Sequence, residues 1–179
     1  KGNVVNPLEI TQRYGADALR MALIIRSSPG LDKSVGEADF KAMRNLTNKL
    51  WNAARFILLQ SSQNPSDVGG GAEDDTFQNH LVQLQAQVTQ NLEKLQIGLA
   101  AETAYTEFWH WYCDQVIEQV KQGQISLSQA VLGLKTFLKL LHPFMPFVTE
   151  AIWQQLVAAQ LTSEPLLVTS QWNLGTIEP

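Results

Sequence analysis

Residues 37–60 read EADFKAMRNLTNKLWNAARFILLQ and contain the longest unbroken helical pattern of the chain. Their apolar residues recur at intervals that combine threes and fours, which places them along one side of an α-helix. These residues are Phe40, Met43, Leu50, Ala54 and Ile57. The segment therefore predicts a long helix with one buried face.

Two shorter helical patterns precede this segment. Pro7 is well placed as a first helical residue, because its missing N–H costs nothing there. Gly15 interrupts the pattern over residues 8–25, which predicts two short helices or one kinked helix that ends by residues 27–30. After the central helix, residues 61–72 read SSQNPSDVGGGA and have no hydrophobic period. We expect a flexible linker over residues 61–74.

Three further helical patterns follow the linker. The first can be capped by Asp74 or Asp75. Its apolar residues keep near-heptad spacing up to a break at Ile97-Gly98. These residues are Phe77, Leu81, Leu84, Val88, Leu92 and Leu95. The second runs on from this break and ends before Gly123. The third opens with a capping box, Ser126 and Gln129, and ends at His142-Pro143.

A last helix is predicted from Pro146 to about residue 161, and residues 166–179 are predicted as an extended tail that packs back on the helices. No alternating apolar pattern rivals these helical periods. The sequence thus predicts an all-α fold: a bundle of about five helices preceded by a short helical segment.

The composition agrees with a soluble globular protein. The chain of 179 residues is 45% hydrophobic and 17% charged, enough to bury a sizeable core. No apolar run approaches the roughly 20 residues of a membrane span, and residues 1–10 lack the apolar region of a secretory signal. One cysteine, Cys113, excludes an internal disulfide and fits a cytoplasmic location.

Charge is distributed unevenly along the chain. Residues 1–60 contain nine Lys and Arg against five Asp and Glu, whereas the whole chain has a net charge of −4. From Phe40 to Ser66 there are four basic residues and no acidic one. A basic region on an acidic protein suggests a polyanionic partner. On charge alone, the plainer interpretation is a solvated helix face that happens to be basic.

No catalytic, cofactor-binding or metal-binding residue is predicted. The sequence has no phosphate-binding loop, dinucleotide fingerprint or metal-ligand spacing. Cys113, among aromatic residues, is interpreted as a small core residue. His110 is interpreted as a histidine with local partners, and His142 as a complement to a helix dipole.

One face of the 37–60 helix is the candidate binding site. Asn45, Lys49, Asn52 and Phe56 are spaced by four, three and four residues and form one strip; Arg44, Asn48 and Arg55 form an adjacent strip. Cations contact phosphates, amides read base edges, and an aromatic ring stacks on an unpaired base. The face therefore predicts RNA binding. In the alternative interpretation, Phe56 joins the core and the amides are solvated.

The sequence resembles class I aminoacyl-tRNA synthetases, and most closely the valyl-tRNA synthetases. The matching stretches appear in the family's order: KGNVVNPLEI (1–10), YGADALR (14–20), RNLTNKLWNAARFIL (44–58), FWHWYCDQVIEQVK (108–121) and LKLLHPFMPFVTEAIWQQL (138–156). The first resembles the residues directly after the family's KMSKS loop, and the third resembles the first helix of its anticodon-binding bundle. Together they span residues 1 to about 172.

This resemblance implies how the chain is organised. Residues 1–35 would contact the tRNA stem, and residues 36–165 would be the anticodon-binding bundle. The nucleotide-binding fold, with its HIGH motif and KMSKS lysines, would lie outside these 179 residues. The resemblance therefore implies that the whole enzyme uses ATP and Mg²⁺. It also implies that this chain by itself is catalytically inactive and binds no cofactor.

The function implied is recognition of a tRNA, valine tRNA first, by a monomeric valine–tRNA ligase. Lys49, Arg55 and Phe56 are the first candidates for contact with the anticodon, and Arg44, Asn45 and Asn52 the second. The alternatives are the same domain of a leucyl- or isoleucyl-tRNA synthetase, or a helical module of synthetase ancestry that binds protein. The last would replace the basic face with an exposed apolar patch.

Overall fold

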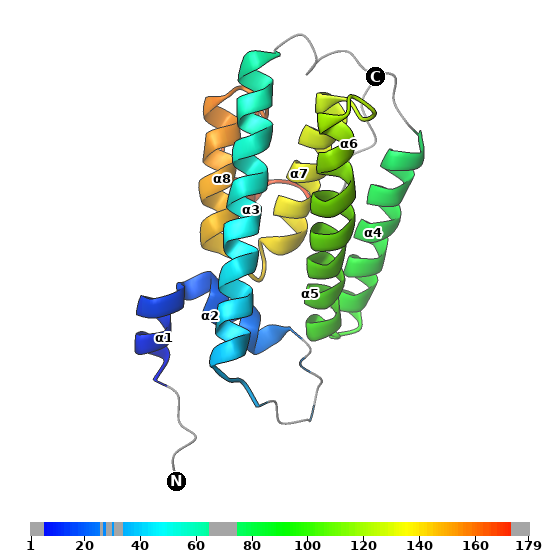
Figure 1. The fold of residues 1–179 in the computed structure, drawn as a ribbon. Coiled ribbons are helices and arrows are strands. Elements are labelled where there is room, and N and C mark those ends of the chain that lie inside the picture. The colour runs from blue at the N-terminus through cyan, green and yellow to red at the C-terminus, as the bar shows by residue number, and fades with distance from the viewer. Residues whose placement is uncertain (1–5, 26, 28–29, 31–33, 65–74, 173–179) are drawn as a thin grey trace.

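A single long helix, α3 (Glu37–Gln63), organises the fold, and the other helices pack around it. The structure is a computed structural model, and it describes residues 6–25, 27, 30, 34–64 and 75–172. Figure 1 shows α3 upright at the front of the bundle, with α8 (Pro146–Ala158) on one side and the rod that contains α5 (Ile97–Thr106) on the other. Helix α7 (Leu127–Leu141) lies behind α3, and α4 (Asp75–Glu93) forms the outer edge.

The predicted apolar side of α3 is buried as expected. Each of the five predicted core residues is less than a tenth exposed, and Leu46 and Ala53 join them. On α4, the near-heptad residues are buried up to Val88, while Leu92 is half-buried and Leu95, beyond the end of the helix, is exposed. One continuous hydrophobic core therefore joins α3 to α4, α7 and α8. The all-α prediction is confirmed.

Local capping signals fix several helix ends where the sequence places them. Asn6 accepts a hydrogen bond from the Leu8 N–H and Pro7 begins α1 (Pro7–Tyr14). Gly15 separates α1 from α2 (Ala16–Ile24) with a φ of 93°, a conformation that disfavours any residue with a Cβ atom. Ser126 and Gln129 form the predicted capping box of α7.

Three segments differ from the sequence prediction. Helix α3 continues to Gln63, into the predicted linker, of which residues 65–74 lie outside the described part. The single helix predicted before Gly123 is a rod of α5, a π-helical stretch η2 (Glu107–Val116) and α6 (Ile117–Lys121). In the tail, which is predicted to be extended, Leu167–Thr169 form the 3₁₀ turn η3.

The tail nevertheless packs on the bundle, as predicted. Leu167 is buried, and its backbone N–H donates to the Glu150 carboxylate at 3.1 Å. The Trp172 indole donates to the Thr89 hydroxyl of α4 at 2.7 Å. These contacts hold residues 167–172 across α8 and α4. Residues 173–179 lie outside the described part.

Helices α1 and α2 are fastened to the lower end of the bundle (Figure 1). Asp17 of α2 is buried and accepts hydrogen bonds from two backbone N–H groups that begin α8, Phe147 at 3.2 Å and Val148 at 2.6 Å. Arg20 donates to the carbonyls of Phe144 and Pro143, between α7 and α8. Burial raises the pKa of Asp17 above its ordinary value, although the two backbone donors act to lower it. Helix α2 thus caps α8.

Candidate nucleic-acid interface

The predicted binding face of α3 has two flanks that meet different neighbours. Lys49 and Phe56 point toward the rod α5–η2–α6, where each contacts a charged or aromatic side chain. Arg44 and Asn48 instead line a hollow shared with α1, α2 and α8. Successive residues of an α-helix are rotated by about 100° around its axis. Lys49 and Phe56 therefore face the rod, whereas Arg44 and Asn48 face the hollow on another side of α3.

Lys49 is the most tightly held cation of the face. Its Nζ lies 2.7 Å from the Asp114 carboxylate and 4.0 Å from the centre of the Trp109 ring. The side chain of Lys49 is 26% exposed, and that of Asp114 is 49% exposed. The hydrogen bond from Lys49 holds the pKa of Asp114 below its ordinary value, so that Asp114 is ionised at neutral pH.

Phe56 lies between the two roles that the sequence allows. The ring is half-buried and packs against the core beside the buried Ile57. The Lys121 ammonium lies 5.6 Å from the ring centre, on the side of α6. Phe56 therefore contributes to packing and still presents part of its ring, next to a cation, at the surface.

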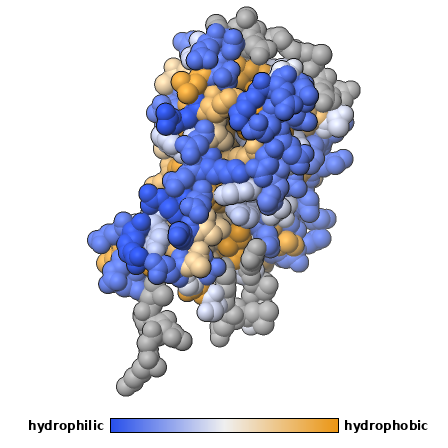
Figure 2. Space-filling view, in the orientation of Figure 1, coloured by the Kyte–Doolittle hydropathy of each residue, from blue (hydrophilic) through white to orange (hydrophobic). Residues whose placement is uncertain are grey.

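The remaining candidates are exposed. Asn45 and Asn52 lie at the surface on the same side of α3 as Lys49. Arg55 is also exposed but lies on the side of α8, where it borders a small hollow, and within the described residues no ion pair engages it. Figure 2 shows that hydrophilic residues cover most of this side of the molecule, with smaller hydrophobic areas between them. The exposed part of the face can meet a large polar ligand without rearrangement.

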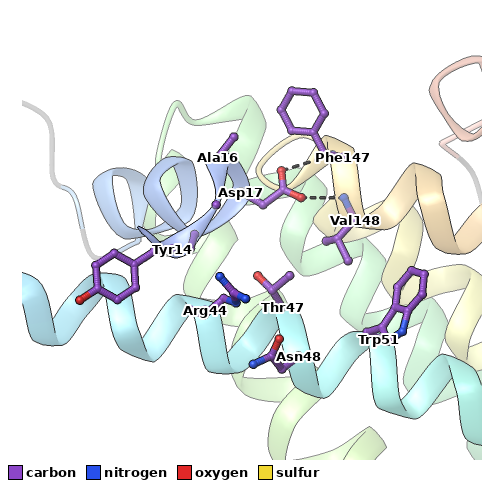
Figure 3. Close-up of a pocket in the computed structure, with 11 residues that line it drawn as sticks. Tyr14, Ala16, Asp17, Arg44, Thr47, Asn48, Trp51, Phe147 and Val148 are labelled. Atoms are coloured by element: carbon purple, nitrogen blue, oxygen red, sulfur yellow. Dashed lines mark hydrogen bonds between the residues drawn. The ribbon is translucent and has the colours of Figure 1, made fainter. Parts of the chain in front are cut away.

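The opposite flank of α3 borders a hollow of about 510 Å³ (Figure 3). Arg44, Asn48 and Trp51 line it from α3, and Phe147 lines it from α8. Trp51 is 41% exposed and Phe147 is 65% exposed. The Arg44 guanidinium donates to the Arg13 carbonyl at 3.4 Å. Aromatic rings beside a cation suit stacking on nucleic-acid bases.

Sequence reasoning missed several residues of this region. Trp51, Phe147 and Asp114 are not among the site residues that the sequence predicts. Phe147 lies at the start of a predicted helix and Asp114 lies within another. Their positions in the sequence do not indicate which other helices they contact. Their contacts with α2 and α3 depend on tertiary packing.

Local surroundings account for Cys113 and for two of the three histidines. Cys113 is partly buried against the core, and burial raises the pKa of its thiol to about 12, which makes this thiol a poor nucleophile. His110 is exposed and pairs with Asp114 at 3.4 Å. Burial lowers the pKa of His142, which contacts the Thr149 hydroxyl at 2.8 Å, so its neutral form is favoured over a charge that would complement a helix dipole.

The described residues contain neither a candidate metal site nor a candidate membrane-spanning helix. In residues 6–25, 27, 30, 34–64 and 75–172, no cluster of three or more His, Cys, Asp or Glu side chains could hold a metal ion. Along the same residues, no helix combines the length and the apolar character that a membrane crossing requires.

Comparison with known proteins gives a consistent result. Residues 74–178 match the family model described as the anticodon-binding domain of tRNA ligase. A valine–tRNA ligase of Dehalococcoides mccartyi (strain ATCC BAA-2266 / KCTC 15142 / 195) is 37% identical over 165 residues, which cover 87% of this chain and 19% of that protein. The valine–tRNA ligase of Mycolicibacterium paratuberculosis is 38% identical over 182 residues, 96% of this chain and 20% of that protein.

A solved structure has a similar fold. It is a LeuRS from Agrobacterium radiobacter K84 in a ternary complex with tRNA and LeuAMS, with a TM-score of 0.75 and 21% identity. The match covers 96% of this chain and 21% of that one. The chain thus spans about a fifth of the length of the relatives it matches.

Proposed function

Because the chain belongs to the family of anticodon-binding domains of tRNA ligases, we propose that it binds the anticodon arm of a tRNA within a valine–tRNA ligase. The valine assignment rests on relatives of 37% and 38% identity that are valine–tRNA ligases. The leucine alternative has support from a structural neighbour at 21% identity, which is evidence of a shared fold alone.

The observation that carries the proposal is the exposed face of α3. From Phe40 to its end, α3 itself carries no acidic residue and offers Arg44, Arg55, Asn45 and Asn52 at its surface, although η2 brings the Asp114 carboxylate to Lys49. Phe56 ends this surface with a partly exposed ring. Amides that can read base edges thus lie beside cations and a stacking surface, the combination that single-stranded RNA loops require.

The proposed roles follow from exposure and contacts. Phe56 stacks on an unpaired anticodon base, and Arg55, which is exposed, contacts a phosphate. Lys49 contacts the RNA beside Phe56. Arg44, on the other flank, borders the hollow with Trp51 and Phe147, where a neighbouring part of the tRNA backbone would pass.

In the whole enzyme this domain would supply binding energy remote from the chemistry. The proposed reaction is ATP- and Mg²⁺-dependent activation of valine in the cytoplasm, followed by transfer to the 3′ end of the tRNA. Anchoring the anticodon arm limits the orientations that the 3′ end can adopt, which favours productive geometry at a distant active site. We propose that the enzyme acts as a monomer.

A protein-binding module is the second candidate. The exposed Trp51 and Phe147 are its strongest support, since exposed aromatic residues often mark protein contacts. These residues share their hollow with Arg44, however, and an RNA ligand satisfies both the rings and the cation. Binding to tRNA separates the two functions.

The proposal predicts a loss of tRNA affinity when the Phe56 ring is removed. Phe56→Ala should weaken binding of valine tRNA by about 1–3 kcal/mol, the usual contribution of one stacked base. The loss should largely vanish with a tRNA whose anticodon nucleotides carry no base, because nothing then stacks on the ring. Fluorescence titration of both tRNAs measures the effect.

Phe56→Leu is the matched control, because it keeps an apolar side chain against the core while removing the aromatic ring. It should preserve stability to urea better than the alanine variant and still lose affinity. If Phe56→Leu binds valine tRNA like the parent while Phe56→Ala only unfolds more easily, then Phe56 is a packing residue and does not stack on RNA.

A further inference from the structure

Lys49 differs from the other cations of α3 because a neighbouring helix already engages it. The Asp114 carboxylate lies 2.7 Å from its ammonium and the Trp109 ring lies 4.0 Å from it, and both side chains come from η2. His110, also on η2, approaches the second Asp114 oxygen at 3.4 Å. The ammonium is thus fixed in position and paired with a negative charge.

The π-helical geometry of η2 makes this double contact possible. Trp109 and Asp114 are five residues apart, a separation that in an α-helix leaves two side chains about 140° apart around the axis. In a π-helix, hydrogen bonds join residues five apart, as the Ile117 N–H does with the Tyr112 carbonyl. Residues five apart in a π-helix therefore lie on nearly the same side of the helix. As a result, Trp109 and Asp114 both face α3.

This arrangement is poorly suited to a phosphate. A phosphate that approached the Lys49 ammonium would also approach the Asp114 carboxylate, and like charges at contact distance repel. Arg55, exposed on the same helix, has no acidic partner among the described residues. Lys49 and Arg55 therefore present different chemistry to an RNA, although both are cations of α3.

We propose that Trp109 and Asp114 are positioning residues for Lys49, and that Lys49 and Asp114 together read the edge of an unpaired base and exclude phosphate. This rests on the proposed tRNA-binding function. The ammonium offers donors, and the carboxylate beside it offers an acceptor. The edge of a base carries a ring or carbonyl acceptor next to an N–H donor and has no net charge, so it matches the pair in hydrogen bonding and in charge.

The test is the salt dependence of tRNA binding by the chain, measured from about 50 to 200 mM KCl, a range over which phosphate contacts weaken strongly. Lys49→Ala should raise the Kd for valine tRNA about tenfold, the effect of a lost hydrogen bond to a charged group. It should leave the slope of log K against log salt unchanged. Arg55→Ala is the matched control and should reduce that slope by about 0.7–0.9, as the loss of one phosphate contact does.

Asp114→Asn tests the carboxylate in a side chain of the same shape. Freed from its partner, Lys49 should accept a phosphate, so the slope should steepen by about 0.7–0.9. The preference for valine tRNA over an anticodon-changed tRNA should fall. Asp114→Glu, which keeps the charge, should restore much of that preference, whereas a merely structural role for Asp114 would alter neither the slope nor the preference. Urea unfolding of each variant verifies that the folded state is compared.

The failures of the two proposals are distinguishable. A parent chain that binds both tRNAs equally contradicts the proposed function. A parent that prefers valine tRNA, with Lys49→Ala reducing the slope as Arg55→Ala does, retains the function and overturns the base-reading role of Lys49. An unchanged preference in Asp114→Asn overturns the role of Asp114.

Discussion

Replacing Phe144 with Ala should lower the free energy of unfolding by about 3–5 kcal/mol, the usual cost of removing a buried phenyl ring and leaving a cavity. Phe144 lies in the turn between α7 and α8, is 2% exposed, and belongs to the continuous core. Its backbone carbonyl also accepts a hydrogen bond from Arg20 of α2. The measurement is urea denaturation of the chain, followed by circular dichroism at neutral pH.

Phe147→Ala is the matched control, because Phe147 is the same residue type three positions further along and is 65% exposed. Removing this ring should lower the free energy of unfolding by less than about 1 kcal/mol, because folding buries little of its apolar surface. Equal losses for the two variants would contradict the packing of this turn. So would a smaller loss for Phe144→Ala than for Phe147→Ala.

Asp17→Ala should lower the free energy of unfolding by about 2–3 kcal/mol, because two hydrogen bonds to one carboxylate are lost at the start of α8. The backbone N–H groups of Phe147 and Val148 would lose their acceptor, that of Val148 in a buried position. Part of the loss is offset, because burying the carboxylate is itself costly, as its raised pKa indicates. Urea denaturation measures this effect as well.

Asp17→Asn separates the hydrogen bonds from the charge. The amide oxygen can still accept one of the two bonds, so the loss of stability should be smaller than for Asp17→Ala. If both variants are as stable as the parent, then α2 does not cap α8, and the attachment of residues 7–24 to the bundle has another origin.

The helix ends that the sequence predicted well depend on local chemistry. Pro7, Gly15 and the Ser126–Gln129 capping box act within one turn of their own positions, and the structure places each as predicted. The π-helix η2 was missed because its aromatic and apolar residues fit an α-helical pattern equally well over so short a stretch. The 3₁₀ turn of the tail was missed because its backbone N–H groups donate to Glu150, a residue distant in sequence.

The candidate site could be predicted only as a list of residues on one helix. Spacing placed Lys49 and Phe56 in one strip and Arg44 in another, which agrees with their different neighbours. Spacing within α3 carries no information about residues from other helices. Asp114 and Trp109 reach Lys49 only because η2 packs beside α3, and Phe147 meets Trp51 only across the hollow.

Anticodon recognition is the central claim, and a comparison of two tRNAs tests it most directly. The affinity of the unmodified chain should be measured for a valine tRNA transcript and for the same transcript with its three anticodon bases replaced. We expect the replaced transcript to bind at least tenfold more weakly at about 0.15 M salt, because base-edge hydrogen bonds of about 1–3 kcal/mol each are lost while stacking and phosphate contacts remain. Equal affinity for the two transcripts would contradict anticodon recognition by this chain.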